Sequence, residues 1–152
     1  MKHIIVCSLV FLIAMAGSAQ ALSPRQDVIK GPLQGEVLEV LDGDTVTVRL
    51  HVWIGQDIQT HVRISGIDAP EIKGKCAYER GKAQQARNEM ISLLPDGKIT
   101  LSNIRLEKYA GRVLAEAQST KGVKVADHMI DKGLARPYAG AKRAGWCSAA
   151  AN

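Results

Sequence analysis

The chain has 152 residues, a formal net charge of +5 and an aromatic content of 4%. This length allows one domain with one modest hydrophobic core. The positive charge is compatible with an anionic polymer as partner, whereas the low aromatic content disfavours a protein that binds by stacking bases on an aromatic platform.

The N-terminus has the pattern of an export signal. Lys2 precedes an apolar run over residues 4–15, and Ala19-Gln20-Ala21 matches a cleavage site. The apolar run is shorter than the roughly 20 residues that span a bilayer, so an uncleaved anchor is the less favoured alternative. We therefore predict a signal peptide at residues 1–21, export to the periplasm or the extracellular space, and no stable membrane association after cleavage.

Two cysteines, Cys76 and Cys147, remain after the predicted cleavage, because Cys7 lies in the apolar run. An oxidising compartment favours a single disulfide between them over two free thiols. Neither has a cysteine or histidine neighbour at a zinc spacing, and the chain has no paired histidine signature and no Gly-x-Ser-x-Gly motif. A zinc hydrolase and a serine hydrolase are therefore disfavoured.

The first half of the mature chain has an irregular lead at residues 22–33 and then strand-like segments separated by turns. Asp42-Gly43 is a strong hairpin signal, and apolar and polar residues alternate after it. A second turn is predicted at residues 55–57. The expected strands cover residues 34–41, 45–50 and 58–67 and form an antiparallel meander.

The second half has helical periodicity before it returns to strands. Ala83, Ala86 and Met90 recur at spacings of three and four, which is typical of an amphipathic helix. The expected elements are a helix at 79–94, strands at 98–104 and 112–118, a helix at 123–132, and a frayed tail at 148–152. This order predicts a mainly β (α+β) domain at residues 34–147: a five-stranded OB-fold barrel with two or three helices packed on it.

The third predicted strand ends in a sharp break within residues 62–71. Gly66 allows backbone angles that other residues avoid, and Asp68 and Glu71 follow the break within reach of Arg63. Carboxylates beside an arginine suit a hard metal ion and a phosphate. The alternative is a strand, a turn and some solvated surface charges.

Three ordered motifs resemble the staphylococcal nuclease (thermonuclease) family. They are Asp42-Gly43-Asp44-Thr45, then Arg63 with Ile67-Asp68-Ala69-Pro70-Glu71, and then Tyr109-Ala110-Gly111-Arg112. The resemblance runs from about Gly35 to Tyr138 and implies an OB barrel. It also implies Ca²⁺-dependent hydrolysis of phosphodiester bonds in DNA and RNA that leaves 3′-phosphate ends.

The resemblance implies metal ligation by Asp44, Asp68 and the backbone carbonyl of Ala69, where the family usually has threonine. Oxygen donors in a loose geometry suffice for Ca²⁺. Asp42 and Thr45 would shape this site without binding the ion.

The resemblance assigns catalysis to Glu71, which would orient or deprotonate the attacking water, and to Arg63 and Arg112, which would clamp the phosphate. A guanidinium group matches phosphate oxygens and stabilises the negative charge that develops at five-coordinate phosphorus. Taken alone, Glu71 and Arg112 would read as surface residues.

Substrate contacts are expected from Lys108, Tyr109 and Tyr138. The family commonly has lysine and tyrosine directly before Gly-Arg, whereas Ala110 intervenes here. For Tyr138, packing at the edge of the core is an equally weighted alternative. We expect a monomer whose partner is DNA or RNA.

Two other functional classes remain as alternatives. One is a catalytically inactive OB-fold module that only binds nucleic acid or protein, and the other is a small exported structural domain. The chain retains all of the carboxylates and arginines that match the family, which argues against the inactive module. A purely structural domain leaves the carboxylates at the strand ends unexplained.

Overall fold

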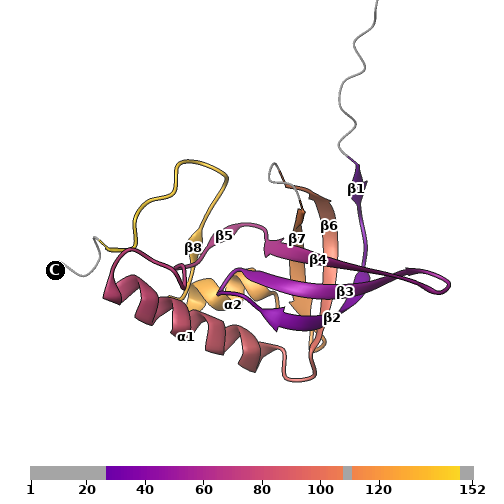
Figure 1. Cartoon of the computed structure of the whole chain (residues 1–152), viewed down its shortest axis with the longest axis horizontal. Coiled ribbons are helices and arrows are strands. Elements are labelled where there is room, and N and C mark those ends of the chain that lie inside the picture. The colour runs from indigo at the N-terminus through magenta and orange to yellow at the C-terminus, as the bar shows by residue number, and fades with distance from the viewer. Residues whose placement is uncertain (1–26, 108–110, 148–152) are drawn as a thin grey trace, which may run out of the picture.

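Five strands close into a barrel in the computed structural model, which describes residues 27–107 and 111–147 (Figure 1). The strands are β2 (Leu33–Val40), β3 (Thr45–Trp53), β4 (Gln56–Ile64), β6 (Lys98–Leu106) and β7 (Arg112–Ser119). β2, β3 and β4 form the predicted antiparallel meander, β4 lies parallel to β7, and β6 joins β7 to β2. This closure confirms the predicted OB-fold barrel.

The interior of the barrel is filled by the apolar residues of these strands. Val46 and Val48 of β3, Val62 of β4 and Leu101 of β6 are fully buried. Side chains two residues apart on a strand point to the same face, so the alternation read from the sequence lines the core.

Two helices cover the barrel, α1 (Ala77–Leu93) and α2 (Val125–Asp131). Ala83, Ala86 and Met90 of α1 are fully buried, as their spacing predicted. α1 begins two residues earlier than expected because the Cys76 sulfur caps it by accepting a hydrogen bond from the backbone N–H of Glu79 at 3.5 Å.

The third strand ends earlier than predicted. β4 stops at Ile64, and the turn that follows contains Gly66 with φ of 85°. The chain then forms the short strand β5 (Ile67–Asp68), which pairs with β8 (Arg136–Pro137) near the C-terminus. The break predicted at Gly66 is therefore confirmed, because Gly66 takes the left-handed conformation, whereas the strand predicted at 58–67 ends three residues too late.

The lead at residues 22–33 is not wholly irregular. Val28–Ile29 forms β1, which pairs antiparallel with Ile104 and Arg105 of β6, and β2 already begins at Leu33. Backbone pairing with β6, which no local residue pattern encodes, explains the difference. The predicted signal peptide at 1–21, the tail at 148–152 and the residues Lys108 and Tyr109 lie outside the described residues.

Cys76 and Cys147 form a disulfide with a Cα–Cα distance of 5.9 Å, which confirms the predicted pairing. The bond joins the start of α1 to the C-terminal segment, which runs as a loop from β8 past α1 (Figure 1). Among the described residues, no helix is both long enough and apolar enough to cross a bilayer.

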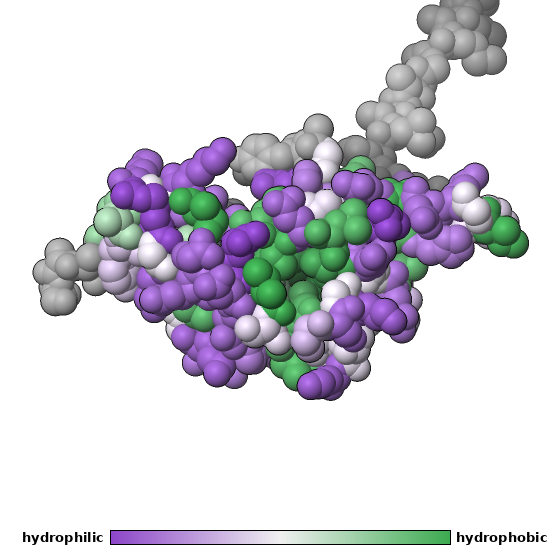
Figure 2. All heavy atoms as spheres, turned by 60° about the horizontal axis from the view of Figure 1, so that its bottom comes forward, coloured by the Kyte–Doolittle hydropathy of each residue, from purple (hydrophilic) through white to green (hydrophobic). Residues whose placement is uncertain are grey.

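Apolar side chains also reach the surface. Figure 2 shows them gathered in the middle of one face with polar side chains around them. The groove between β2 and the end of α1 is lined by Val37, Val40 and Leu94, among others. Trp53 and Ile54, at the tip of the β3–β4 hairpin, are 68% and 86% exposed.

Candidate active site

The barrel brings the first two motifs together at one end of β3 and β4. Thr45 is the register partner of Arg63 across these antiparallel strands. Asp44 directly precedes Thr45, and the backbone N–H of Ile64 donates to the Asp44 carbonyl at 2.8 Å. The hairpin register therefore places a carboxylate beside an arginine that is 19 residues away in the sequence.

Asp44 connects three segments through a buried carboxylate. Its Oδ1 accepts hydrogen bonds from an Arg63 guanidinium nitrogen at 2.7 Å and from the Thr45 hydroxyl at 2.9 Å. Its Oδ2 accepts from the backbone N–H of Ala69 at 2.8 Å. Thr45 therefore contacts the predicted metal ligand, and Asp44 holds the backbone of Ala69 beside it.

The turn before Asp44 is held by Asp42 and by a close approach of α1. Asp42 Oδ1 accepts a hydrogen bond from the Asp44 backbone N–H at 3.2 Å. Burial, together with the charge of Asp44, raises the pKa of the Asp42 carboxyl to about 7. A Cβ atom on Gly43 would lie 2.6 Å from the Cβ of Ala86, so α1 can pack here only against glycine.

Asp68 is fully buried and surrounded by cationic groups. Its Oδ2 accepts hydrogen bonds from Arg136 at 2.9 and 3.1 Å and from the Trp146 indole N–H at 3.2 Å. Its Oδ1 lies 3.8 Å from an Arg63 nitrogen and forms an ion pair with Nε of Arg143. The Arg136 guanidinium also lies over the Trp146 ring, 4.4 Å from its centroid.

The three residues to which the resemblance assigns catalysis line one pocket. Arg63, Glu71 and Arg112 face a cavity of about 340 Å³, which Tyr138 and Arg143 also border. Arg112 Nε lies 2.9 Å from Oε2 of Glu107. β4, β7 and the loop after β5 therefore deliver two guanidinium groups and a carboxylate to one space.

Tyr138 borders this pocket from the C-terminal segment. Its hydroxyl donates to the Ala141 carbonyl at 2.7 Å, and the Arg63 guanidinium carbon lies 6.0 Å from its ring centroid. A second cavity of about 590 Å³, also bordered by Arg63 and Tyr138, adjoins it along β6. The predicted substrate residue Tyr138 thus lies at the site, while Lys108 and Tyr109 are outside the described residues.

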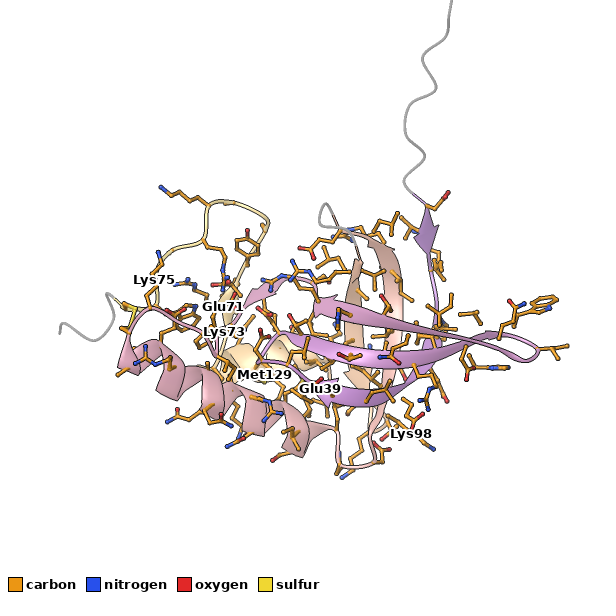
Figure 3. All side chains as sticks on the ribbon, viewed as in Figure 1. Glu39, Glu71, Lys73, Lys75, Lys98 and Met129 are labelled. Carbon is orange, nitrogen blue, oxygen red and sulfur yellow. A yellow bond between two sulfur atoms is a disulfide. The ribbon has the colours of Figure 1, made fainter. Side chains whose placement is uncertain are left out.

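Glu71 lies on the loop between β5 and α1, beside Lys73 and Lys75 (Figure 3). This loop is held by Glu79, which is buried and accepts backbone hydrogen bonds from Lys75 at 3.1 Å and from Glu71 at 3.5 Å. The Glu71 side chain is 44% exposed and pairs with Arg143. Glu71 is therefore fixed through its backbone, with its carboxylate toward the pocket.

Sequence reasoning missed Arg143. Its guanidinium pairs with Asp68 Oδ1 and Glu71 Oε1, and it donates to the Ala69 carbonyl at 3.0 Å. Partial burial acts to lower the pKa of Arg143, but the hydrogen bond to Glu71 and the charges of Asp68 and Glu71 outweigh it, so the pKa is raised. The Cys76–Cys147 pairing was the available signal, because it brings residues near Cys147 to the loop that carries Glu71.

The donor chemistry of the site fits a hard cation. Asp44, Asp68 and the Ala69 carbonyl offer only oxygen atoms, and the contacts of the buried Asp68 Oδ1 are its ion pairs with Arg63 and Arg143. Arginine side chains, however, lie among these oxygens. Within residues 27–107 and 111–147, one group of three acidic, histidine or cysteine side chains has its ligand atoms within 4.8 Å of one another. It consists of Cys76, Glu79 and Cys147, and the two cysteine sulfurs are joined in the disulfide.

Comparison with known proteins identifies the family of the chain. Two curated relatives, from Escherichia coli and Escherichia coli O157:H7, each bear the name "Uncharacterized endonuclease". Each is 28% identical to this chain over 111 residues, which is 73% of this chain and 65% of the relative, so the chain spans just under two thirds of their length. The family model of the staphylococcal nuclease homologues matches residues 61–147, more than half of the chain. On this match, the chain belongs to the staphylococcal nuclease homologue family.

Proposed function

We propose that this chain is an exported, Ca²⁺-dependent endonuclease that hydrolyses phosphodiester bonds of DNA or RNA. The observation that carries the proposal is the convergence of Arg63, Glu71 and Arg112 on one pocket, in a chain of a nuclease family. The buried carboxylates Asp44 and Asp68 adjoin that pocket through Arg63. The relatives' names support an endonuclease rather than an exonuclease.

Asp44, Asp68 and the Ala69 carbonyl would hold the cation. A hard divalent ion with flexible coordination, such as Ca²⁺, suits this set of oxygen donors. When bound, the ion would supply Lewis-acid polarisation of the scissile phosphate.

The chain's own residues would position and activate the reactants. Arg63 and Arg112 would donate N–H groups to the phosphate oxygens and offset the charge that builds up as water attacks phosphorus. Glu71 would accept the proton of that water. Cleavage of the bond between phosphorus and the 5′ oxygen would then leave a 3′-phosphate and a 5′-hydroxyl, with a solvent proton completing the leaving group.

Conversion of supercoiled plasmid tests this proposal. We expect the mature chain to nick and linearise the plasmid with Ca²⁺ and to lose that activity in a chelator. Glu71→Gln should lower the rate by at least about a hundredfold. The matched control is Glu39→Gln, because Glu39 is an exposed carboxylate on β2, apart from the loop that carries Glu71 (Figure 3). Nucleic acid binding without any cleavage would instead identify an inactive binding module.

Export is tested separately. The full-length chain should be recovered from the periplasm or the medium of a bacterial host, and N-terminal sequencing should find Leu22 as its first residue. Recovery from the cytoplasm with Met1 retained would contradict the export proposal without affecting the nuclease proposal.

A further inference from the structure

The C-terminal segment delivers a cation to the oxygens assigned to the metal. Arg143 lies between β8 and Cys147, and its guanidinium contacts Asp68 Oδ1, the Ala69 carbonyl and Glu71 Oε1. Two of these three are predicted metal ligands, and the third is the predicted base. The Arg143 side chain therefore contacts oxygens that the nuclease reaction would need for binding the metal and for accepting a proton.

We propose that Arg143 is an internal cation that competes with the divalent metal, so that the metal binds only when Arg143 leaves these oxygens. The inference rests on the proposed function, because it takes Asp68 and Ala69 as metal ligands. It adds that the C-terminal segment, through Arg143, controls the affinity of the site for its metal ion.

Their positive charges prevent the Arg143 guanidinium and the divalent metal from occupying the site at the same time. Asp68 already faces Arg63 and Arg136 in addition to Arg143. A divalent ion on Asp68 Oδ1 would lie next to the Arg143 guanidinium, where repulsion between like charges is weakly screened in a buried setting. The Arg143 guanidinium also occupies the space next to Asp68 Oδ1 that the metal would need. Departure of Arg143 relieves both conflicts.

The segment is anchored on both sides of Arg143, which keeps the guanidinium close to the site. On one side, Arg136 of β8 binds Asp68 Oδ2. On the other, the Trp146 indole N–H binds the same oxygen, and Cys147 is joined to Cys76. These anchors hold Arg143 at a high effective concentration. Its side chain is 37% exposed, so it has solvent into which it can move.

Population arithmetic gives the size of the effect. The apparent affinity of a site is its intrinsic affinity multiplied by the fraction of molecules in which the site is free. If Arg143 occupies the oxygens in about nine molecules of ten, its removal should tighten metal binding about tenfold.

Calorimetric titration of Ca²⁺ into the oxidised mature protein, without nucleic acid, is the test. We expect Arg143→Ala to bind Ca²⁺ about tenfold more tightly than the unmodified protein. Lys142→Ala removes a neighbouring exposed positive charge and should leave the affinity within about twofold, which separates local competition from a general change in charge. Equal or weaker binding by Arg143→Ala would overturn the inference.

Failure of the metal assignment gives a different result. If neither the unmodified protein nor Arg143→Ala binds Ca²⁺, the metal site itself is wrong, and this inference falls with it. If the unmodified protein binds Ca²⁺ and Asp44→Asn abolishes the binding, the site stands, and Arg143→Ala alone decides the inference.

A second variant tests the tether with Arg143 intact. Cys76→Ser combined with Cys147→Ser frees the end of the segment, while the hydroxyl introduced at position 76 retains an acceptor that can cap α1. We expect its Ca²⁺ affinity to move toward that of Arg143→Ala, because the effective concentration of the guanidinium falls. An unchanged affinity would show that the disulfide does not hold Arg143 on the site.

Discussion

Arg63 and Arg112 reach the same pocket but are attached to the protein in different ways. Arg63 is 11% exposed and forms a buried pair with Asp44, so its substitution would leave an uncompensated carboxylate. Arg112 is 34% exposed and pairs with Glu107. Of the two arginines, Arg112 therefore gives the cleaner test of phosphate binding.

Arg112→Lys should lower kcat by at least about a hundredfold, because a lysine cannot present two N–H groups to two phosphate oxygens. Steady-state kinetics on a fluorogenic oligonucleotide would measure this, and far-UV circular dichroism should remain unchanged. Arg49→Lys is the matched control, because Arg49 is exposed on β3 and pairs with Glu36. Full activity of Arg112→Lys would remove Arg112 from the phosphate clamp.

At the scale of elements, α1 shapes the site because it packs closely against the Asp42–Asp44 turn. Gly43 is buried between the Cβ atoms of Ala86 and Ala69, which would lie 2.6 and 2.9 Å from an added Cβ. The small residues of α1 thus set the position of the turn that carries Asp44. Gly81, on the same helix, has nothing within 4 Å of its added Cβ.

Two glycine substitutions should therefore change the free energy of unfolding in opposite directions. Gly43→Ala should lower the free energy of unfolding by about 1–3 kcal/mol through overpacking and should weaken Ca²⁺ binding. Gly81→Ala should raise it by about 1 kcal/mol, because alanine is the better helix former and meets no clash. Urea denaturation measures both, and a stable Gly43→Ala protein would show that α1 tolerates displacement at this turn.

The disulfide joins the start of α1 to the C-terminal segment, two parts of the chain that are far apart in the sequence. Cys76 caps α1, and Cys147 ends the described C-terminal segment, 71 residues later. A crosslink across a loop of this length restricts the unfolded chain, which stabilises the folded state by about 4 kcal/mol in the chain-entropy description.

Reduction should therefore lower the free energy of unfolding by about 4 kcal/mol in urea denaturation. The double serine variant should match the reduced protein and should not respond to reductant. Thiol titration of the denatured, oxidised protein should detect no free cysteine, and two free thiols would contradict the crosslink.

At the scale of the whole molecule, the closed barrel fixes the strand ends that carry the site. β2, β3, β4, β7 and β6 form a continuous ring, so the ends of β4 and β7 cannot separate without breaking the sheet. A ligand that binds only the folded ring should therefore stabilise the whole domain cooperatively.

Ca²⁺ at about a hundred times its dissociation constant should raise the free energy of unfolding by about 2.7 kcal/mol. Thermal melts with Ca²⁺ and with a chelator measure the difference, and Asp44→Asn should show none. A melting temperature independent of Ca²⁺ in the unmodified protein would argue against a site formed by the fold.

The sequence alone determined the order of the five barrel strands and the two helices, the barrel, the cysteine pair and the family motifs. Each of these depends on local periodicity, on a short motif or on a count of residues. The inward positions of β3 and α1 follow from periods of two and 3.6, so the residue pattern was enough to place Val46, Ala86 and Met90 in the core.

Only the tertiary structure decided what surrounds the carboxylates. Arg143 meets Glu71 and the Ala69 carbonyl across more than 70 residues, and β8 pairs with β5 although neither strand has more than two residues. No local period encodes such contacts, because they arise from where the closed barrel and the disulfide return the chain. The resemblance pointed to the oxygens of the site, and the fold revealed the guanidinium group that lies on them.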